Sequence, residues 1–428
     1  MSRKYCIAFL YTDLNKYSIH VLIAAIQFKR IDIDVHLINI HDFFNLVNSL
    51  LTKYDKVIVG ISLMTTQLPD LLPFIWSLRR FKTLNSDRVL IIGGGPHVSG
   101  DPLGSLKSLG FDYVFIGEAE ESLTEFLGNL INGDDLAKVG GIAYIDDDKL
   151  VVKNSPKPVN LDDYPPFPTE GGLFNPIEVS RGCPYACKYC QVSHIFGVVM
   201  RHRSTTSIIN YCKFLISKGI KDLRFISPNI LAYGGDGRKL NYSSVIEFLD
   251  SMSRLRNLGG RVYLGTFPSE VRPEFIDRDV VKVLKNCVDN KRIAIGAQSG
   301  SDKVLKGLNR GHTVDDVINA VSILREYGFG VDVDFIIGLP IEELTDMYET
   351  LGFIRKLISL GNVRVRLHTY LPLPGTPLAK YGIKPIPNTV KKELMKLLGR
   401  GVIFGDWLKQ EELARKVVEL MKEGIILS

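Results

Sequence analysis

Cysteine and tryptophan are scarce in this 428-residue sequence, which contains six cysteines and two tryptophans. Three of the six cysteines lie within one stretch of eight residues, so they cannot form the dispersed pairs of a small disulfide-stabilised secreted protein. No apolar run approaches the roughly 20 residues needed to span a bilayer, and Met1 to Lys4 lead into an expected strand without a signal-type apolar segment. We therefore expect a cytoplasmic protein in a reducing environment, with no membrane partner.

A large excess of charge of one sign is also missing. The chain has 53 Lys and Arg against 47 Asp and Glu, a net charge of +6, and its hydrophobic content of 45% is that of a soluble globular protein. Nucleic-acid binders usually concentrate positive charge in a patch, whereas the signs are interleaved even in the more basic residues 379–428. The charge pattern leaves an RNA substrate open but gives it no support.

The three clustered cysteines are Cys183, Cys187 and Cys190, with the spacing C-x3-C-x2-C directly after a short apolar strand expected at 176–179. Three thiolates from one tight loop can bind three irons of a cubane [4Fe-4S] cluster and leave the fourth iron without a protein ligand. A structural zinc site with His194 as fourth ligand is the alternative, but such sites usually take two ligand pairs from two places. The spacing therefore predicts an iron–sulfur cluster.

Residues 1–139 alternate short β-branched apolar runs with amphipathic stretches of helical period. Strands are expected at 5–11, 33–40, 56–64, 89–92 and 113–116, and helices at 17–29, 68–81, 103–109 and 120–131. This alternation predicts an α/β fold with a Rossmann-like doubly wound sheet, which binds ligands at the carboxyl ends of its strands. Residues 140–172 indicate an antiparallel hairpin and a proline-rich linker, so the domain boundary is expected there.

Residues 173–380 repeat the alternation of strands and helices. Six strands are expected at 176–179, 222–227, 261–267, 292–297, 331–337 and 364–369. Six βα units predict a partial (β/α)6 barrel with its chemistry at the carboxyl ends of the strands, although counting alone leaves a closed eightfold barrel open. Residues 381–428 form a C-terminal helical region, with helices expected at 388–398 and 406–422, which we expect to cover the open side.

The cysteine spacing and the strand before it resemble the radical S-adenosylmethionine (SAM) superfamily. The resemblance implies that the open iron binds SAM through its amino and carboxylate groups, and that a donor such as ferredoxin or flavodoxin supplies the electron. Polar residues at the strand ends resemble the SAM-binding set of the coproporphyrinogen-oxidising branch, including the twelve-residue step from Gln298 to Arg310.

By that likeness each residue has an implied contact with SAM. Arg310 would pair with the SAM carboxylate and Glu270 with its ammonium. Gln298, with Ser299 beside it, and Asp334 would meet other polar edges of SAM, and the backbone of Tyr189 would meet its adenine.

The first domain lacks a G-x-G-x-x-G turn after its first strand, so NAD is not expected there. Ser62 and the run Gly93, Gly94 and Gly95 instead resemble the cobalamin (B12)-binding domain that often precedes a radical SAM barrel. The motif D-x-H-x-x-G, whose histidine binds cobalt, is absent: residues 15–20 read Asn-Lys-Tyr-Ser-Ile-His. We therefore expect cobalamin without an imidazole from this motif, and a domain that has lost its corrin is the alternative.

These likenesses imply an enzyme that cleaves SAM to a 5′-deoxyadenosyl radical and, with a corrin, methylates an unactivated carbon. The sequence indicates neither the substrate nor a catalytic residue beyond the cofactor contacts. A tRNA methylthiotransferase would resemble the barrel and the turn Pro374-Gly375-Thr376-Pro377, but it uses three more cysteines in a first domain that here has only Cys6. A non-catalytic Fe–S or corrin-binding sensor would be expected to have lost the SAM-binding residues.

Overall fold

The computed structural model describes residues 4–153 and 158–428, which divide into two compact units. One unit is Met1–Asn175 with Leu373–Thr376 and Lys416–Ser428, and the other is Pro176–Pro372 with Pro377–Arg415. The expected hairpin and linker at 140–172 fall within the first unit, and the expected C-terminal region 381–428 is shared between both. Residues 154–157 of that linker lie outside the described residues.

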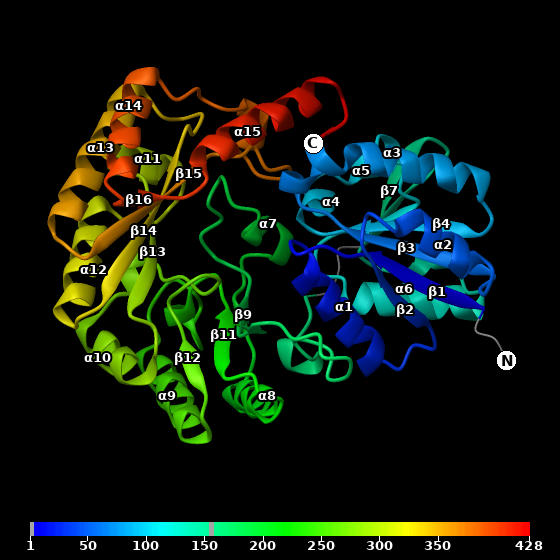
Figure 1. Cartoon of the computed structure of the whole chain (residues 1–428), viewed down its shortest axis with the longest axis horizontal. Coiled ribbons are helices and arrows are strands. Elements are labelled where there is room, and N and C mark those ends of the chain that lie inside the picture. Colours follow the sequence, from blue (N-terminus) through cyan, green and yellow to red (C-terminus); the bar gives the residue numbers. More distant parts are fainter. Residues whose placement is uncertain (1–3, 154–157) are drawn as a thin grey trace. The chain divides into compact units, whose positions relative to one another are not determined.

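The first unit is built on a seven-stranded sheet in the order β2-β1-β3-β4-β5-β6-β7 (Figure 1). Its parallel part is β1 (Tyr5–Leu10), β2 (Asp34–Ile38), β3 (Lys56–Ser62), β4 (Val89–Gly94) and β5 (Tyr113–Phe115). The hairpin of β6 (Ile142–Asp146) and β7 (Lys149–Val152) continues the sheet antiparallel to β5, which is why it belongs to this unit. The order 2-1-3-4-5 places a topological switch point between β1 and β3, where doubly wound sheets bind ligands.

Helices cover both faces of this sheet: α1 (Lys16–Phe28), α2 (Phe43–Leu51), α3 (Leu68–Leu84), α4 (Pro96–Gly100), α5 (Pro102–Lys107) and α6 (Glu120–Asn132). On one face, Phe9 of β1 shares a buried core with Ile23 of α1 and Phe126 of α6. Helix α2 packs against α3, with the rings of Phe43 and Phe74 5.0 Å apart. The sequence analysis missed α2, although its buried residues at positions 43, 47 and 50 have helical spacing.

The second unit contains two parallel sheets. The first consists of β8 (Ile177–Glu178), β11 (Asp222–Ile226) and β12 (Arg261–Tyr263). The second consists of β13 (Arg292–Gln298), β14 (Gly330–Ile337), β15 (Val363–Thr369) and β16 (Ile403–Phe404). A parallel bridge between Val271 and Ile295 connects them. No pairing among the described residues joins β8 to β16, so the partial barrel that we expected is confirmed. The short strand β16 was not expected, because it lies among glycines.

The helices of the second unit line the outside of these strands (Figure 1). They are α8 (Thr205–Ser217), α9 (Tyr242–Ser253), α10 (Arg278–Cys287), α11 (Asp302–Gly307), α12 (Val314–Glu326), α13 (Leu344–Ser359) and α14 (Asn388–Gly399). The last helix, α15 (Trp407–Lys422), is divided between the two units, with residues from Lys416 onward in the first. A small hairpin, β9 (Ser180–Arg181) and β10 (Arg201–His202), flanks the cysteine loop together with α7 (Val192–Phe196). In the described part of the chain, no helix has the length and apolar character needed to cross a bilayer.

Candidate functional site

The cysteine loop follows β9 and is folded tightly onto itself. The hydroxyl of Ser193 donates to the carbonyl oxygen of Cys183 at 2.7 Å and accepts the N–H of Ala186 at 3.2 Å. The N–H of Cys190 donates to the carbonyl oxygen of Cys187 at 2.9 Å. Helix α7 thus fixes the backbone that carries the three sulfur atoms.

The three thiols lie near one another. None forms a disulfide. Burial raises the pKa of the Cys190 thiol to about 11, and Cys187 and Cys183 are near enough to raise it too. In a cubane cluster each of the three thiolates would bind a different iron.

Arg310 lies directly against this loop. Its Nη1 is 3.8 Å from Cys187 Sγ, and its Nη2 donates to the carbonyl oxygen of Gly296 at 2.9 Å. Its Nε is buried without a hydrogen-bond partner. A buried guanidinium with an unused donor beside a cluster loop can bind a carboxylate, which is the group that the sequence assigned to it.

A second layer of charged residues holds Arg310 in place. The guanidinium of Arg272 stacks 3.4 Å above the Tyr185 ring, pairs with Glu274 at 2.6 Å, and donates to the carbonyl oxygen of Arg310. Burial, with Arg310 and Arg272 nearby, lowers the pKa of His312 to about 2, so this imidazole is neutral. The sequence analysis missed Arg272, although it follows Glu270 by two residues at the same strand end.

Charged side chains also line the inside of the barrel. In the register of β14 with β15, Asp332, Asp334 and Ile336 lie beside Arg364, Arg366 and His368, in that order. Near the amino ends of the strands, Asp332 pairs with Arg292 at 2.8 Å and with Arg364 at 2.9 Å. This ion-pair cluster fills the end of the barrel away from the cysteine loop.

One step nearer the carboxyl ends, Arg366 joins two of the predicted SAM residues. It pairs with Asp334 at 3.0 Å and with Glu270 at 2.9 Å. Burial, and the neighbouring Glu270, raise the pKa of Asp334, whereas its ion pair with Arg366 lowers it. Arg366 was missed because the sequence does not show which side chains of β14 and β15 are opposite each other.

The other predicted SAM residues divide into two groups. Gln298 has a left-handed backbone with a φ of 72°. Its side-chain amide and the Arg310 guanidinium both lie beside Gly296, where a Cβ would come within 2.8 Å of each. Tyr189 lies close to Arg310 and the cysteines and packs on the apolar cluster around Leu339. Ser299 is apart from them, because its fully buried hydroxyl lies 3.3 Å from Thr350 Oγ1 and accepts the Ser301 N–H. The SAM contacts of all these residues stay predictions, and Ser299 gains no support from its position.

His368 stands at the mouth of the barrel with a defined tautomer. The Oε1 atom of Gln410 accepts the backbone N–H of Thr369 at 2.9 Å. The other end of the Gln410 amide, its NH2 group, therefore donates to Nδ1 of His368, 3.3 Å away. Burial and the nearby Arg366 lower the pKa of His368 and keep the ring neutral. His368 therefore presents its other nitrogen, Nε2, as an N–H donor.

This tautomer gives a testable prediction for Gln410→Glu. A carboxylate would accept from both Thr369 and His368, so the imidazole proton should move from Nε2 to Nδ1. Nitrogen-15 NMR of histidine-labelled protein distinguishes the protonated from the unprotonated ring nitrogen by chemical shift, and His368→Gln assigns the signals. In Gln410→Glu the protonated signal should belong to Nδ1 instead of Nε2. Gln410→Met, which removes the bond without reversing it, is the control, and a parent protein already protonated at Nδ1 would contradict the assignment.

In the first unit, the predicted cobalamin residues lie at the carboxyl ends of β3 and β4. The hydroxyl of Ser62 is 2.8 Å from that of Ser18, and Asn15 bridges the switch point by donating to the carbonyl oxygens of Leu10 and Ser62. Asn15, which replaces the aspartate of the cobalt-ligand motif, therefore ties the two strand ends together.

The three glycines of this edge differ in what surrounds them. A Cβ at Gly93 would meet the Phe111 ring at 2.2 Å, and Gly95 needs its φ of 91° for the turn. A Cβ at Gly94 would have only one neighbour within 4 Å, 3.9 Å away. The backbone of Gly94 is thus the part that a bulky ligand can approach, which fits a corrin at this edge.

His20, the one histidine in residues 15–20, is already fully used. Its Nε2 is 2.8 Å from the Tyr11 hydroxyl, its Nδ1 is 2.7 Å from Asn175 Oδ1, and it is buried. Binding cobalt through either nitrogen would break one of these buried hydrogen bonds. Tyr17, at the motif's histidine position, is a phenol and a poor ligand at neutral pH.

We therefore predict cobalamin with its own base displaced and no imidazole on cobalt. Electron paramagnetic resonance of the cobalt(II) form should show no splitting from a coordinating nitrogen, and His20→Ala should leave the spectrum unchanged. A nitrogen splitting that disappears in His20→Ala would identify His20 as the ligand and contradict this prediction.

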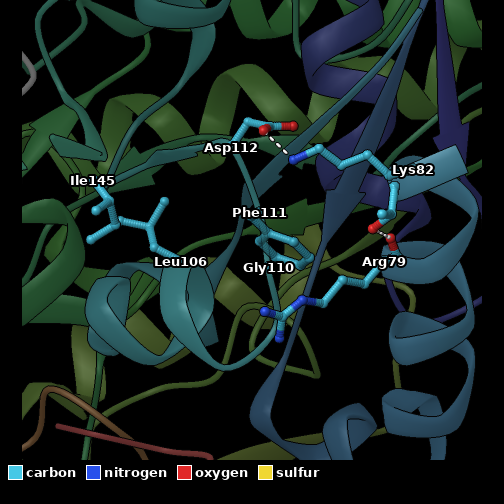
Figure 2. A pocket seen from close by; sticks show the side chains of 8 residues that line it. Arg79, Lys82, Leu106, Gly110, Phe111, Asp112 and Ile145 are labelled. Carbon is cyan, nitrogen blue, oxygen red and sulfur yellow. Dashed lines mark hydrogen bonds and ion pairs between the residues drawn. The ribbon is translucent and has the colours of Figure 1, made fainter. Parts of the chain in front are cut away.

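A separate pocket of about 310 Å³ lies at the amino end of β5 (Figure 2). Lys82 of α3 forms an ion pair there with Asp112, which also accepts the N–H of Ile91 at 2.7 Å. The side chain of Arg79 packs over Gly110, where a Cβ would come within 2.8 Å of it. Phe111, which lines this pocket, also lies against Gly93, but Ser62 and Gly94 are not among the lining residues.

Known protein families match both the first and the second part of the chain. Residues 177–354 match the radical SAM superfamily and residues 4–127 match the B12-binding domain. An uncharacterized methyltransferase of Pyrococcus horikoshii is 26% identical over 356 residues, 79% of this chain and 72% of that protein. A tRNA-2-methylthio-N(6)-dimethylallyladenosine synthase of Sulfurihydrogenibium sp. is 27% identical, over 58% of this chain and 55% of its own length.

Solved structures show the same two-domain fold. TsrM of Kitasatospora setae, a radical SAM methyltransferase solved with cobalamin and a [4Fe-4S] cluster, has a TM-score of 0.69 at 17% identity, covering 89% of this chain and 77% of its own. OxsB, a cobalamin-dependent SAM radical enzyme, has a TM-score of 0.65 at 17% identity, covering 96% of this chain and 56% of its own.

The expected cofactors are thereby confirmed as those of the two matched domains: a [4Fe-4S] cluster, SAM and cobalamin. The chain thus carries a radical SAM domain at residues 177–354 and, before it, a B12-binding domain at residues 4–127.

Proposed function

We propose that this protein is a cobalamin-dependent radical SAM methyltransferase that transfers a methyl group to an unactivated carbon. The observation that carries the proposal is the pairing, in one chain, of a cysteine loop backed by Arg310 with a B12-binding domain whose Gly94 edge is open. The likeness to TsrM, and to the relative named a methyltransferase, favours methyl transfer over other radical chemistry.

In this proposal Cys183, Cys187 and Cys190 hold the cluster, and Arg310 binds the SAM carboxylate. The cluster, when bound, supplies the electron that cleaves SAM, and the cobalamin carries the methyl group. The Arg366 cluster with Glu270 and Asp334 shapes the polar side of the SAM site. A one-electron donor such as ferredoxin or flavodoxin is the partner required, and the cytoplasm is the compartment that suits reduced thiols.

The sequence argues against a methylthiotransferase. Cys6 is the single cysteine before the motif, and burial on β1 raises the pKa of its thiol to about 12. The first unit therefore cannot provide the three thiolates of a second cluster.

The test is anaerobic purification, reconstitution with iron, sulfide and cobalamin, and incubation with dithionite as the electron source and SAM carrying a deuterated methyl group. We expect 5′-deoxyadenosine, and S-adenosylhomocysteine with the label on cobalamin. A protein with an intact cluster and SAM cleavage that binds no cobalamin would overturn the methyltransferase proposal.

A further inference from the structure

The short segment Val198–Val199, which lies just before β10 and is called the Val198–Val199 tip below, lies against the first cluster cysteine and is exposed. The N–H of Cys183 donates to the carbonyl oxygen of Gly197 at 3.1 Å, and a Cβ on Gly182 would meet the carbonyl oxygen of Val199 at 2.3 Å. Yet Val198 and Val199 are 54% and 71% exposed. Two neighbouring apolar side chains thus face solvent within a few bonds of a predicted cluster ligand.

Basic side chains outnumber acidic ones beside this tip. The turn at 236–239 reaches it, since a Cβ at Gly237 would touch Pro184 and Met200. Arg238 and Lys239 are exposed on this turn, together with one carboxylate, that of Asp236. Exposed cations lie in water, where they can attract an acidic partner.

We propose that the Val198–Val199 tip, with Arg238 and Lys239 on the turn beside it, is the docking surface for an acidic one-electron carrier protein. This inference rests on the proposed function, because the carrier would reduce the cluster that Cys183 helps to hold. One electron passes from the reduced carrier to the cluster, so the carrier is oxidised and the cluster is reduced. No covalent bond forms or breaks at the surface. A small apolar centre with a charged rim is typical of short-lived redox encounters, which bury less than about 1,200 Å².

The test compares two routes of electrons into the reconstituted full-length protein. Reduced flavodoxin, an acidic carrier, is mixed with the parent and with Val199→Glu/Lys239→Glu, and cluster reduction is followed by stopped-flow absorbance and by electron paramagnetic resonance. The matched control is Met395→Glu/Lys392→Glu on α14, which changes one exposed apolar residue and one exposed cation in the same way. Dithionite, which needs no docking, reduces each protein in parallel.

We expect flavodoxin to reduce the tip variant at least about tenfold more slowly, with a weaker dependence on salt, because electrostatic steering of encounter has this size. Dithionite should reduce all three proteins alike, and the α14 control should match the parent with flavodoxin. Equal flavodoxin rates in the tip variant and the parent would overturn the docking surface while leaving the proposed function intact. A parent with no dithionite-reducible cluster would overturn the proposed function, and the docking surface with it.

Discussion

The triple variant Cys183→Ala/Cys187→Ala/Cys190→Ala should contain almost no iron or sulfide after reconstitution, whereas the parent should hold about four irons per chain. The loss is complete because the three thiolates are the only protein ligands that the loop offers. SAM cleavage should disappear as well, since the electron has no site to enter. Iron and sulfide analysis, with the visible absorbance of the cluster, measures the effect.

The remaining cysteines provide the control. Cys287 of α10 is buried in the apolar packing, and burial raises the pKa of its thiol to about 12. Cys287→Ala should therefore keep the full iron content of the parent. A parent that holds one equivalent of zinc and no sulfide would contradict the cluster and favour a structural zinc site.

The sequence predicted the long strands of the barrel well. Strands β13, β14 and β15 begin and end within one residue of the expected positions, because their apolar residues recur at every second position, unlike the helical periods around them. The cysteine loop could be predicted for a different reason: its spacing alone limits the chemistry. Strand β16, with two residues, has no such signal.

Contacts between strands could not be predicted in this way. Arg366 meets Asp334 and Glu270 only because β14 and β15 are parallel in a particular register. Gln410 is 42 residues from His368 in sequence and reaches it from another element. Ser299 shows the opposite error: it follows Gln298 directly, but β13 ends at Gln298 and the Ser299 hydroxyl lies near Thr350 instead.

Arg310→Ala should weaken SAM binding by roughly 2 to 5 kcal/mol, the usual loss when one partner of a desolvated ion pair is removed. That loss corresponds to an affinity roughly 30-fold to several thousandfold lower. The buried guanidinium offers an unused Nε beside Cys187, so a carboxylate placed there would have lost its water. Calorimetric titration with SAM of the anaerobic, reconstituted protein measures the affinity.

The experiment must distinguish two roles of Arg310, SAM binding and support of the cysteine loop, because Arg310 also donates to the carbonyl oxygen of Gly296. Arg310→Lys keeps the charge but not the fork of donors, so it should bind SAM with intermediate affinity while its iron content stays that of the parent. Arg364→Ala, which removes a cation from the ion pair with Asp332 at the far end of the barrel, should leave SAM affinity unchanged. If Arg310→Ala keeps its iron and binds and cleaves SAM like the parent, Arg310 is a support of the cysteine loop and the SAM carboxylate lies elsewhere.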